Sequence, residues 1–222
     1  DTLDIIKKEK LEQKVAKETT RVVAPQVPGM VFVPAGKFLY GPKKEEKFLE
    51  AFYIDVEPVT NAAYKKYVEE TKYPKPSIWE RNPDVAADEL PVTGVSWMDA
   101  VQYCKWAGKE LPTAEQWEKA ARGDDGRTFP WGEDKPTPKD ACFRPEGDGF
   151  TKLMPITGYE KNRSPYGCHL MVGHVWEWTK TNSVDEETSC VVKGGSWSDP
   201  AEPEFLSTFA WLDAGKKEKI EL

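Results

Sequence analysis

The stretch from Asp124 to Leu222 constrains the fold most, because apolar residues nowhere recur in it at helical spacing. It is rich in glycine, proline and aromatic residues, and short strands are predicted at Val175–Trp178, Val191–Lys193 and Phe205–Trp211. The whole chain holds nine tryptophans and eighteen prolines among 222 residues, which indicates large rings that fill irregular space between loops. Together these features predict an α+β domain with little regular secondary structure.

Composition is that of a globular protein and excludes several functions. Hydrophobic residues make up 39% and charged residues 31% of the chain, which is long enough to bury a substantial core. A net charge of -7 argues against broad nucleic-acid binding and against docking on anionic lipid. No apolar run reaches the roughly 18 residues that a membrane span needs. Since the first residue is Asp1, we expect either a mature product exported after signal cleavage or a fragment.

Residues 1–21 differ from the rest of the chain in mixing lysine and glutamate without any glycine or proline. Four apolar residues recur at near-helical spacing there: Leu3, Ile6, Leu11 and Val15. The pattern predicts a charged, weakly amphipathic helix. We therefore divide the chain into a helical arm with a proline-containing linker at 1–28 and a domain at 29–222. Two interpretations stay open for the arm: a solvated extension, or a helix that packs on a partner protein or drives self-assembly.

The domain begins with predicted strands at residues 30–34 and 36–41, and a third over residues 48–54. A helix is predicted to begin near Thr60 and to run through Val68. These elements precede the part of the chain with the clearest capping signals.

Two further helices are predicted from their end signals. Ser96 is a candidate N-cap with Asp99 three residues later, and Gly108 ends that helix. Thr113 and Gln116 form a capping-box pattern, in which each side chain accepts a backbone N–H that the helix itself leaves unpaired. Gly123 is predicted to end the second of these helices.

Several motifs occur in a fixed order along the domain. They are Val95-Ser96-Trp97, Leu111-Pro112-Thr113, Phe129-Pro130-Trp131-Gly132, Asn162-Arg163-Ser164-Pro165-Tyr166-Gly167, Gly173-His174-Val175-Trp176-Glu177-Trp178-Thr179 and Val191-Val192-Lys193-Gly194-Gly195-Ser196-Trp197. In this order they resemble the formylglycine-generating enzyme family, also called the sulfatase-modifying-factor family, over about residues 29–211. The resemblance implies a single C-type-lectin-like α+β domain.

The resemblance also implies which residues would carry catalysis. The founding enzymes oxidise a substrate cysteine to formylglycine with molecular oxygen, and two cysteines beyond the Gly-Gly-Ser-aromatic block hold their copper ion. Counted from Trp197, those positions fall on Asp199 and Glu204, and the last cysteine is Cys190. Cu(I) prefers soft thiolates, and carboxylates are hard ligands. We therefore expect no copper and no oxygenase activity of this kind.

The resemblance further implies a first calcium site. It would use the side chain of Asp148 and the carbonyl oxygens of Phe143 and Phe150. A further ligand position falls on Cys142, which suits Ca²⁺ poorly because the ion takes roughly six to eight oxygen ligands. An Asp-Gly turn is the alternative role for Asp148.

A second calcium site would use Glu177 and the carbonyl oxygens of Gly173 and Val175. Its other acidic or amide ligand falls on Leu170, which cannot coordinate a metal ion. The alternative for Glu177 is a structural carboxylate that accepts loop N–H bonds.

The two histidines and four cysteines are weak candidates for other sites. His169, His174 and Cys168 lack the spacing of a zinc site, and a Cys168–His169 nucleophile fails because neighbours in an extended segment point to opposite faces. The resemblance implies a disulfide partner for Cys104 that this chain lacks, so Cys104 is expected to be a buried thiol. Pairing among Cys142, Cys168 and Cys190 stays open.

We predict a non-catalytic module that acts as a protein-binding or assembly subunit. Its contacts would be the N-terminal arm and the late aromatic segment with Phe205, Phe209 and Trp211, where the resemblance implies arginines. One alternative is a metal- and oxygen-dependent oxidoreductase of the wider family. Its pocket would lie near Asp199, Glu204, Glu177 or His174. Another alternative is a ligand-display domain, like the receptor-binding proteins that share this fold.

Overall fold

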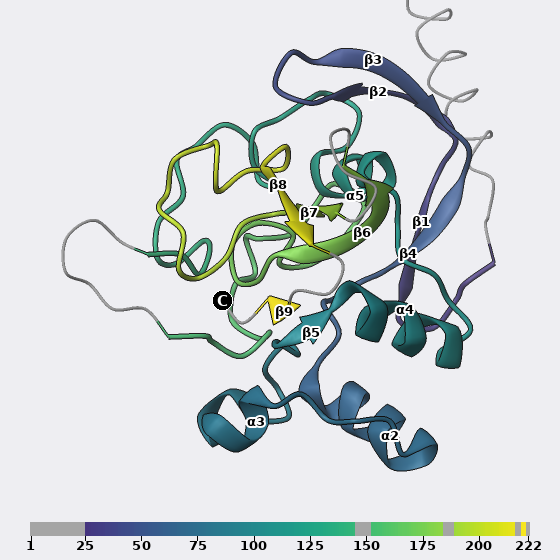
Figure 1. Ribbon diagram of the computed structural model, residues 1–222. Helices are drawn as coiled ribbons and strands as arrows, with labels where there is room; N and C mark the ends of the chain where they lie inside the picture. The colour runs from purple at the N-terminus through teal and green to yellow at the C-terminus, as the bar shows by residue number, and fades with distance from the viewer. Residues whose placement is uncertain (1–24, 145–151, 184–188, 216–218, 221–222) are drawn as a thin grey trace, which may run out of the picture.

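The computed structural model describes residues 25–144, 152–183, 189–215 and 219–220 (Figure 1). The predicted N-terminal helix therefore lies outside the described residues, together with its four apolar residues Leu3, Ile6, Leu11 and Val15. Asp148 and Phe150 of the first predicted calcium site also lie outside them.

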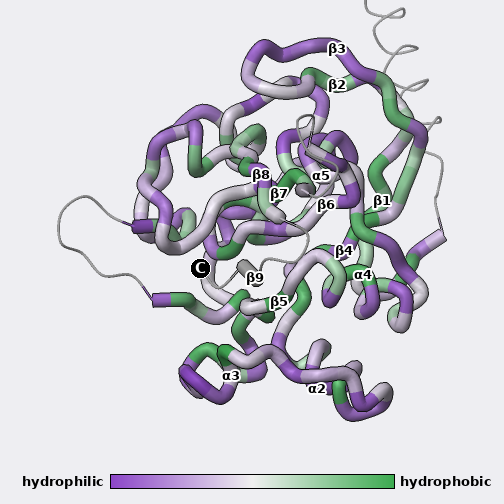
Figure 2. Tube along the Cα trace, in the orientation of Figure 1, coloured by the Kyte–Doolittle hydropathy of each residue, from purple (hydrophilic) through white to green (hydrophobic). Residues whose placement is uncertain are grey.

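Four strands open the domain as two antiparallel pairs. β1 (Met30–Val33) pairs with β4 (Phe52–Asp55), and β2 (Gly36–Tyr40) pairs with β3 (Glu45–Leu49) in a hairpin. The first two predicted strands are confirmed, but the predicted third strand over 48–54 is wrong, because residues 48 and 49 end β3 and residues 52–54 belong to β4. The apolar pattern missed most of β3 because that strand is mainly charged, as its contrast with β1 shows (Figure 2).

The three predicted helices are confirmed with their caps. α2 (Asn61–Thr71) begins after Thr60, α4 (Trp97–Trp106) after Ser96 and α5 (Ala114–Arg122) after Thr113. Complete capping boxes start α4 and α5. The short α3 (Ile78–Arg81) and the 3-10 helix Pro83–Ala86 were not predicted. No helix in the described part of the chain is long and apolar enough to cross a membrane.

After α5, the described residues form strands and loops without a further helix. β6 (Glu177–Asn182), β7 (Ser189–Lys193) and β8 (Trp211–Gly215) make an antiparallel sheet in that order. β9 (Lys219–Ile220) pairs with the short β5 (Val95–Ser96). The small sheets and sparse helices confirm an α+β fold with little regular structure.

The predicted strand Phe205–Trp211 is wrong in its position. The segment before Trp211 forms turns, in which the N–H groups of Phe205 and Leu206 both donate to the carbonyl oxygen of Glu202. Ser207 then accepts from the N–H of Ala210, at 3.0 Å. The ladder with β7 begins only at Trp211, which lies opposite Lys193.

A buried ion network joins α5 to β7. Glu118 accepts from Arg122 at 2.7 Å and from Lys193 at 2.9 Å, and all three side chains are almost fully buried. Arg122 also donates to the carbonyl oxygens of Gly41 and Gly126. The network therefore fixes the β2–β3 hairpin and the loop after α5 to one another, and charges this deeply buried require such complete pairing.

Candidate functional site

A cavity of about 460 Å³ lies among β4, α2, α4 and the segment that leads into β6. This volume is in the range of pockets that hold small ligands. The loop after α4, residues 108–112, forms part of its wall. Strands and helices far apart in sequence thus line one cavity. Figure 1 shows how these elements are arranged in space.

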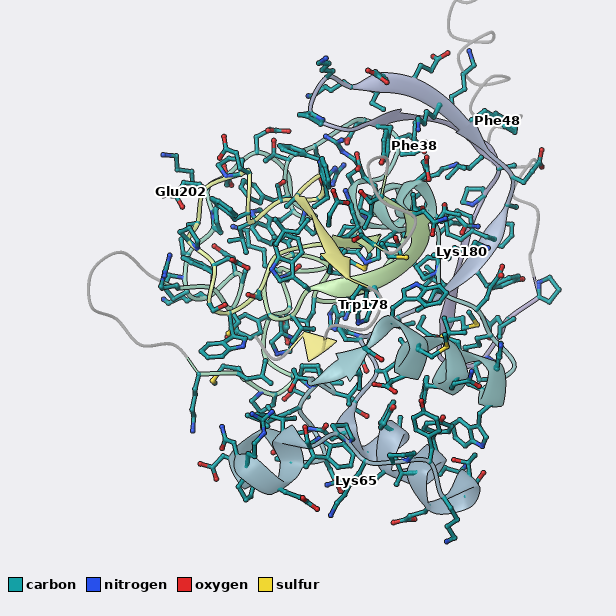
Figure 3. The ribbon with its side chains drawn as sticks, in the orientation of Figure 1. Phe38, Phe48, Lys65, Trp178, Lys180 and Glu202 are labelled. Atoms are coloured by element: carbon teal, nitrogen blue, oxygen red, sulfur yellow. The ribbon has the colours of Figure 1, made fainter. Side chains whose placement is uncertain are left out.

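Aromatic rings form much of the cavity wall. Tyr64 from α2 stacks on Tyr103 from α4, with ring centroids 5.4 Å apart and an interplanar angle of 17°. Trp178 is held by its indole N–H, which donates to the carbonyl oxygen of Val95 at 3.1 Å. Figure 3 shows Trp178 near the centre of the molecule, close to β6 and β5. Such fixed rings give the cavity a rigid apolar surface.

Trp176 lines the same cavity but differs from Trp178 in its hydrogen bonding. Its side chain is only 5% exposed, and its Nε1–H has no hydrogen-bond partner among the described residues. Buried donors are nearly always paired, so this N–H is unusual, and it has almost no solvent-accessible surface of its own.

Glu177, which lies between these tryptophans in the sequence, has a pKa that its surroundings raise. Burial raises the pKa of Glu177 to about 7, and the nearby Asp55 carboxylate adds to the rise. The indole N–H of Trp117, on α5, donates to Glu177 Oε2 at 2.9 Å and opposes the rise. No cation in the described residues lies within ion-pair distance of Glu177.

The remaining charged groups of the lining are mostly acidic. Asp55 pairs with Lys109 at 2.6 Å, and Glu110 pairs with Lys180, outside the lining, at 3.0 Å. Glu57 lies 3.7 Å from the Nδ1 atom of His169, whose pKa is lowered by burial. Four carboxyl groups thus face one lysine and a histidine that favours its neutral form, so the lining is electronegative.

The predicted redox positions lie elsewhere. Asp199 Oδ2 accepts from the backbone N–H of Ser196 at 2.8 Å and from its hydroxyl at 2.6 Å, so Asp199 closes a turn. Glu204 is exposed in the following turn, and neither carboxylate lines the cavity. His174 is fully buried, with its Nε2 against the carbonyl oxygen of Met154. Of the four candidate residues for the oxidoreductase alternative, Glu177 lines this cavity and the other three do not.

The predicted calcium ligands are described only in part. Phe143 is buried in a cluster with Phe129 and Leu206. Gly173 has φ +74° and its N–H donates to the carbonyl oxygen of Gly194, while Glu177 accepts from an indole rather than from loop N–H groups. The described residues contain no group of three or more His, Cys, Asp or Glu side chains placed to hold a metal ion. Calcium binding stays a prediction.

No disulfide joins any of the four cysteines, which answers the open question of pairing. Cys104 is half-buried at the cavity, where burial raises the pKa of its thiol to about 11. Cys168 is fully buried, and its pKa is raised to about 12. Neither thiol is ionised near neutral pH, so neither is an activated nucleophile.

The predicted partner-binding residues separate in the structure. Phe205 and Trp211 are 40% and 52% exposed, whereas Phe209 is half-buried with its ring 5.4 Å from the guanidinium of Arg122. Leu212, next to Trp211 on β8, is 39% exposed and was not predicted. Two exposed apolar side chains therefore lie at the start of β8, one on each face of the strand, and Phe209 is not among the exposed residues.

Sequence reasoning missed the cavity, because its wall comes from many separate segments of the chain. The Trp176-Glu177-Trp178 run was the one available signal, since it places an acid between two large rings. Tyr64 and Tyr103 looked like ordinary apolar positions of helices.

Comparisons with known proteins agree on the fold of this chain. The family model of the sulfatase-modifying factor enzyme 1-like domain matches residues 14–219 of this chain. The inactive C-alpha-formylglycine-generating enzyme 2 of Mus musculus is 31% identical, over 80% of this chain and 77% of its own length. The hercynine oxygenase of Mycolicibacterium smegmatis is 30% identical, over 68% of this chain and 45% of its own length. The structure of PvdO from Pseudomonas aeruginosa matches with a TM-score of 0.70 and 19% identity, covering 89% of this chain and 96% of PvdO.

Proposed function

The chain belongs to the sulfatase-modifying factor enzyme 1-like domain family, and within it we propose that this protein is a non-catalytic, protein-binding or assembly subunit of a larger complex. The turn at Ser196–Asp199 carries the proposal. Asp199 stands at the first position that the resemblance assigns to a copper-binding thiol, and its Oδ2 already accepts two hydrogen bonds from Ser196. A carboxylate in this state supplies neither a soft ligand nor a redox-active sulfur.

Two further observations support a non-catalytic role. Glu204, at the second thiol position, is an exposed carboxylate in a turn. The mouse relative that is 31% identical is itself called inactive.

The start of β8 supports the protein-binding part of the proposal. β8 is an edge strand of the β6-β7-β8 sheet, and it exposes Trp211 and Leu212. Edge strands with large apolar side chains are prone to pair with another chain, and tryptophan is enriched among residues that dominate binding energy.

The catalytic part is tested by Cu(I) uptake and peptide oxidation. The purified chain is titrated with Cu(I) against a chromogenic chelator, then incubated with a cysteine-containing peptide and oxygen. We expect no conversion of cysteine to formylglycine by mass spectrometry, and no copper at Asp199 and Glu204. The Asp199→Cys/Glu204→Cys double variant is the matched control, and should withdraw about one Cu(I) from the chelator. Formylglycine made by the unaltered chain would refute the proposal.

The binding part is tested by co-purification from the native source. Trp211→Asp should lose a partner that the unaltered chain retains, because it replaces the most exposed large apolar side chain of β8 with a charge. Phe48→Asp is the matched control, since Phe48 is 59% exposed on β3 (Figure 3). Equal partner recovery with both variants would rule out β8 as the contact.

A metal- and oxygen-dependent oxidoreductase is the alternative, and similarity to hercynine oxygenase supports it. Elemental analysis of the protein purified from its native source distinguishes the two. Stoichiometric iron or copper that is lost in Glu177→Ala would favour the alternative.

Calcium at the Asp148 site is a separate part of the proposal. Calorimetric titration of Ca²⁺ should show one binding event in the unaltered chain and none in Asp148→Ala. Equal heats from both proteins would remove the site from the proposal.

A further inference from the structure

The cavity of about 460 Å³ is bounded by two separate hydrophobic clusters of the domain. Tyr64, Val95 and Trp178 of its wall belong to one cluster. Phe52 and Ile54, which also line the cavity, pack against the other cluster. The core of a domain is usually contiguous, so a cavity that separates two clusters is a place where a bound molecule would join them.

The apolar wall keeps surface that a ligand can cover. Several apolar side chains of the lining are only partly buried: Phe52, Ile54, Val92, Ala100 and Leu111. Removing such surface from water is favourable and roughly proportional to the area covered. The wall therefore favours a ligand that is largely apolar.

The volume and the rings of the wall indicate the size and shape of this ligand. An engineered apolar cavity of about 150 Å³ holds benzene. A cavity of about 460 Å³ therefore has room for a molecule of two rings. Phe52 and Tyr103 present partly buried rings to the cavity, and aromatic rings pack well on one another in offset or edge-to-face arrangements.

The hydroxyl of Tyr103 is a polar group that the ligand can reach. It has no hydrogen bond with a described residue, and it is not one of the sealed, unpartnered polar atoms of the described residues, so it keeps accessible surface. Burial raises the pKa of Tyr103, and Asp55 and Cys104, which also line the cavity, add to the rise. The hydroxyl therefore stays protonated and can donate to a ligand oxygen.

The charged side chains of the lining disfavour a charged ligand. Carboxyl groups outnumber basic groups there, which disfavours an anion. Asp55 already pairs with Lys109 at 2.6 Å, and Glu110 with Lys180 at 3.0 Å. A cation would therefore lose its hydration to carboxylates that already have partners.

We infer that the cavity binds an uncharged, bicyclic aromatic molecule that carries a hydrogen-bond-accepting oxygen. The rings of the ligand lie between the two clusters, and the Tyr103 hydroxyl donates to the oxygen. Neither Asp199 nor Glu204 lines this cavity, so the site differs from the positions that the resemblance assigns to copper-binding thiols.

Four probes with the same ring system test this chemistry. Naphthylmethanol carries the oxygen without a charge, methylnaphthalene lacks the oxygen, and naphthoate and naphthylmethylammonium carry a negative and a positive charge. Equilibrium dialysis with fluorescence detection should show naphthylmethanol bound about fivefold more tightly than methylnaphthalene, as expected for one hydrogen bond. Both charged probes should bind about tenfold or more weakly than naphthylmethanol, because they lose hydration without gaining a free opposite charge.

Cys104 reports occupancy of the cavity in the unaltered chain. It lines the cavity and is partly buried, whereas Cys142, Cys168 and Cys190 are buried. Iodoacetamide at mildly alkaline pH should therefore alkylate Cys104 before the other three thiols. Saturating naphthylmethanol should slow this alkylation severalfold, as measured by peptide mapping with mass spectrometry.

Two variants assign the contacts. Ala100→Leu should weaken naphthylmethanol about tenfold, because the larger side chain fills part of the cavity from α4. Ala62→Leu is the matched control, since Ala62 is exposed on α2 and does not line the cavity. Tyr103→Phe should lower naphthylmethanol to the level of methylnaphthalene and leave methylnaphthalene unchanged, because it removes the donor and keeps the ring.

Three results would contradict the inference. Binding of either charged probe as tight as that of naphthylmethanol would overturn the uncharged assignment. Equal affinities of naphthylmethanol and methylnaphthalene for the unaltered chain would overturn the role of Tyr103. No binding of any probe up to its solubility limit, with no protection of Cys104, would overturn the site itself, whereas the proposed protein contact at β8 would stand.

Discussion

Glu177 illustrates how a single residue of this fold acquires a property that its type does not predict. The carboxyl group lies beside two tryptophans and accepts one indole N–H, so burial dominates its environment. A group of this kind couples folding to pH.

The free energy of unfolding should therefore fall as pH rises through the range in which Glu177 ionises. Its folded-state pKa of about 7 lies above the ordinary 4.5, so the folded chain holds this proton more tightly than the unfolded chain. The contribution of Glu177 to the free energy of unfolding is fully present below about pH 4.5 and is lost as pH rises through 7. Glu177→Gln keeps the acceptor for Trp117 and should reduce the loss of unfolding free energy between pH 5 and 8 by about 2 kcal/mol. Denaturant titrations across this range measure it, and parallel profiles for both proteins would contradict the assignment.

The buried network predicts a larger effect at Arg122. Arg122→Met leaves Glu118 paired only with Lys193 and frees the carbonyl oxygens of Gly41 and Gly126. We expect about 3 kcal/mol of destabilisation, the cost typical of breaking a buried pair. Arg127→Met is the control, because its pair with Asp125 is partly exposed and should cost under about 1 kcal/mol. Similar losses in urea unfolding for both variants would show that the network is not the cause.

At the scale of elements, the helices begin where their caps lie. Ser96 accepts from the N–H of Asp99 at 3.2 Å, and Asp99 accepts from the N–H of Ser96 at 2.8 Å. Both contacts are local in sequence, so the pattern alone predicts them.

Removing one cap should cost a measurable part of the stability. Ser96→Ala should destabilise the domain by about 1 kcal/mol, because an N–H of the first turn of α4 loses its acceptor. Ser77→Ala is the matched control, since Ser77 precedes α3 without a side-chain cap bond and should change stability by under about 0.5 kcal/mol. Thermal unfolding measures both, and equal shifts would argue against the capping role.

The strand β8 shows where element-scale prediction fails. The aromatic run from Phe205 to Trp211 has the composition of a strand, yet its first residues form turns. Thr208 illustrates the reason: its hydroxyl lies 2.9 Å from the carbonyl oxygen of Arg127 and 3.0 Å from that of Thr128. These contacts come from a segment about eighty positions away, which no local pattern records.

At the scale of the whole molecule, the division at residue 28 stays a prediction. Deletion of residues 1–24 should leave the thermal unfolding midpoint of the domain within about 2 °C, because a thin apolar stripe contributes little core. The same deletion should reduce partner recovery or oligomer size in sedimentation if the arm is a contact. Loss of folding on deletion would instead make the arm part of the domain.

The sequence by itself determined the family, the three capped helices, the sparse secondary structure and the carboxylates at the two thiol positions. Each depends on residue identity or on contacts three or four residues apart, which a linear pattern preserves. The tertiary structure alone decided the cavity, the environments of Glu177 and Trp176, the absence of a disulfide among the four cysteines and the start of β8. These depend on side chains from distant segments brought within contact distance, and burial among such neighbours sets pKa values and leaves hydrogen-bond donors unpaired.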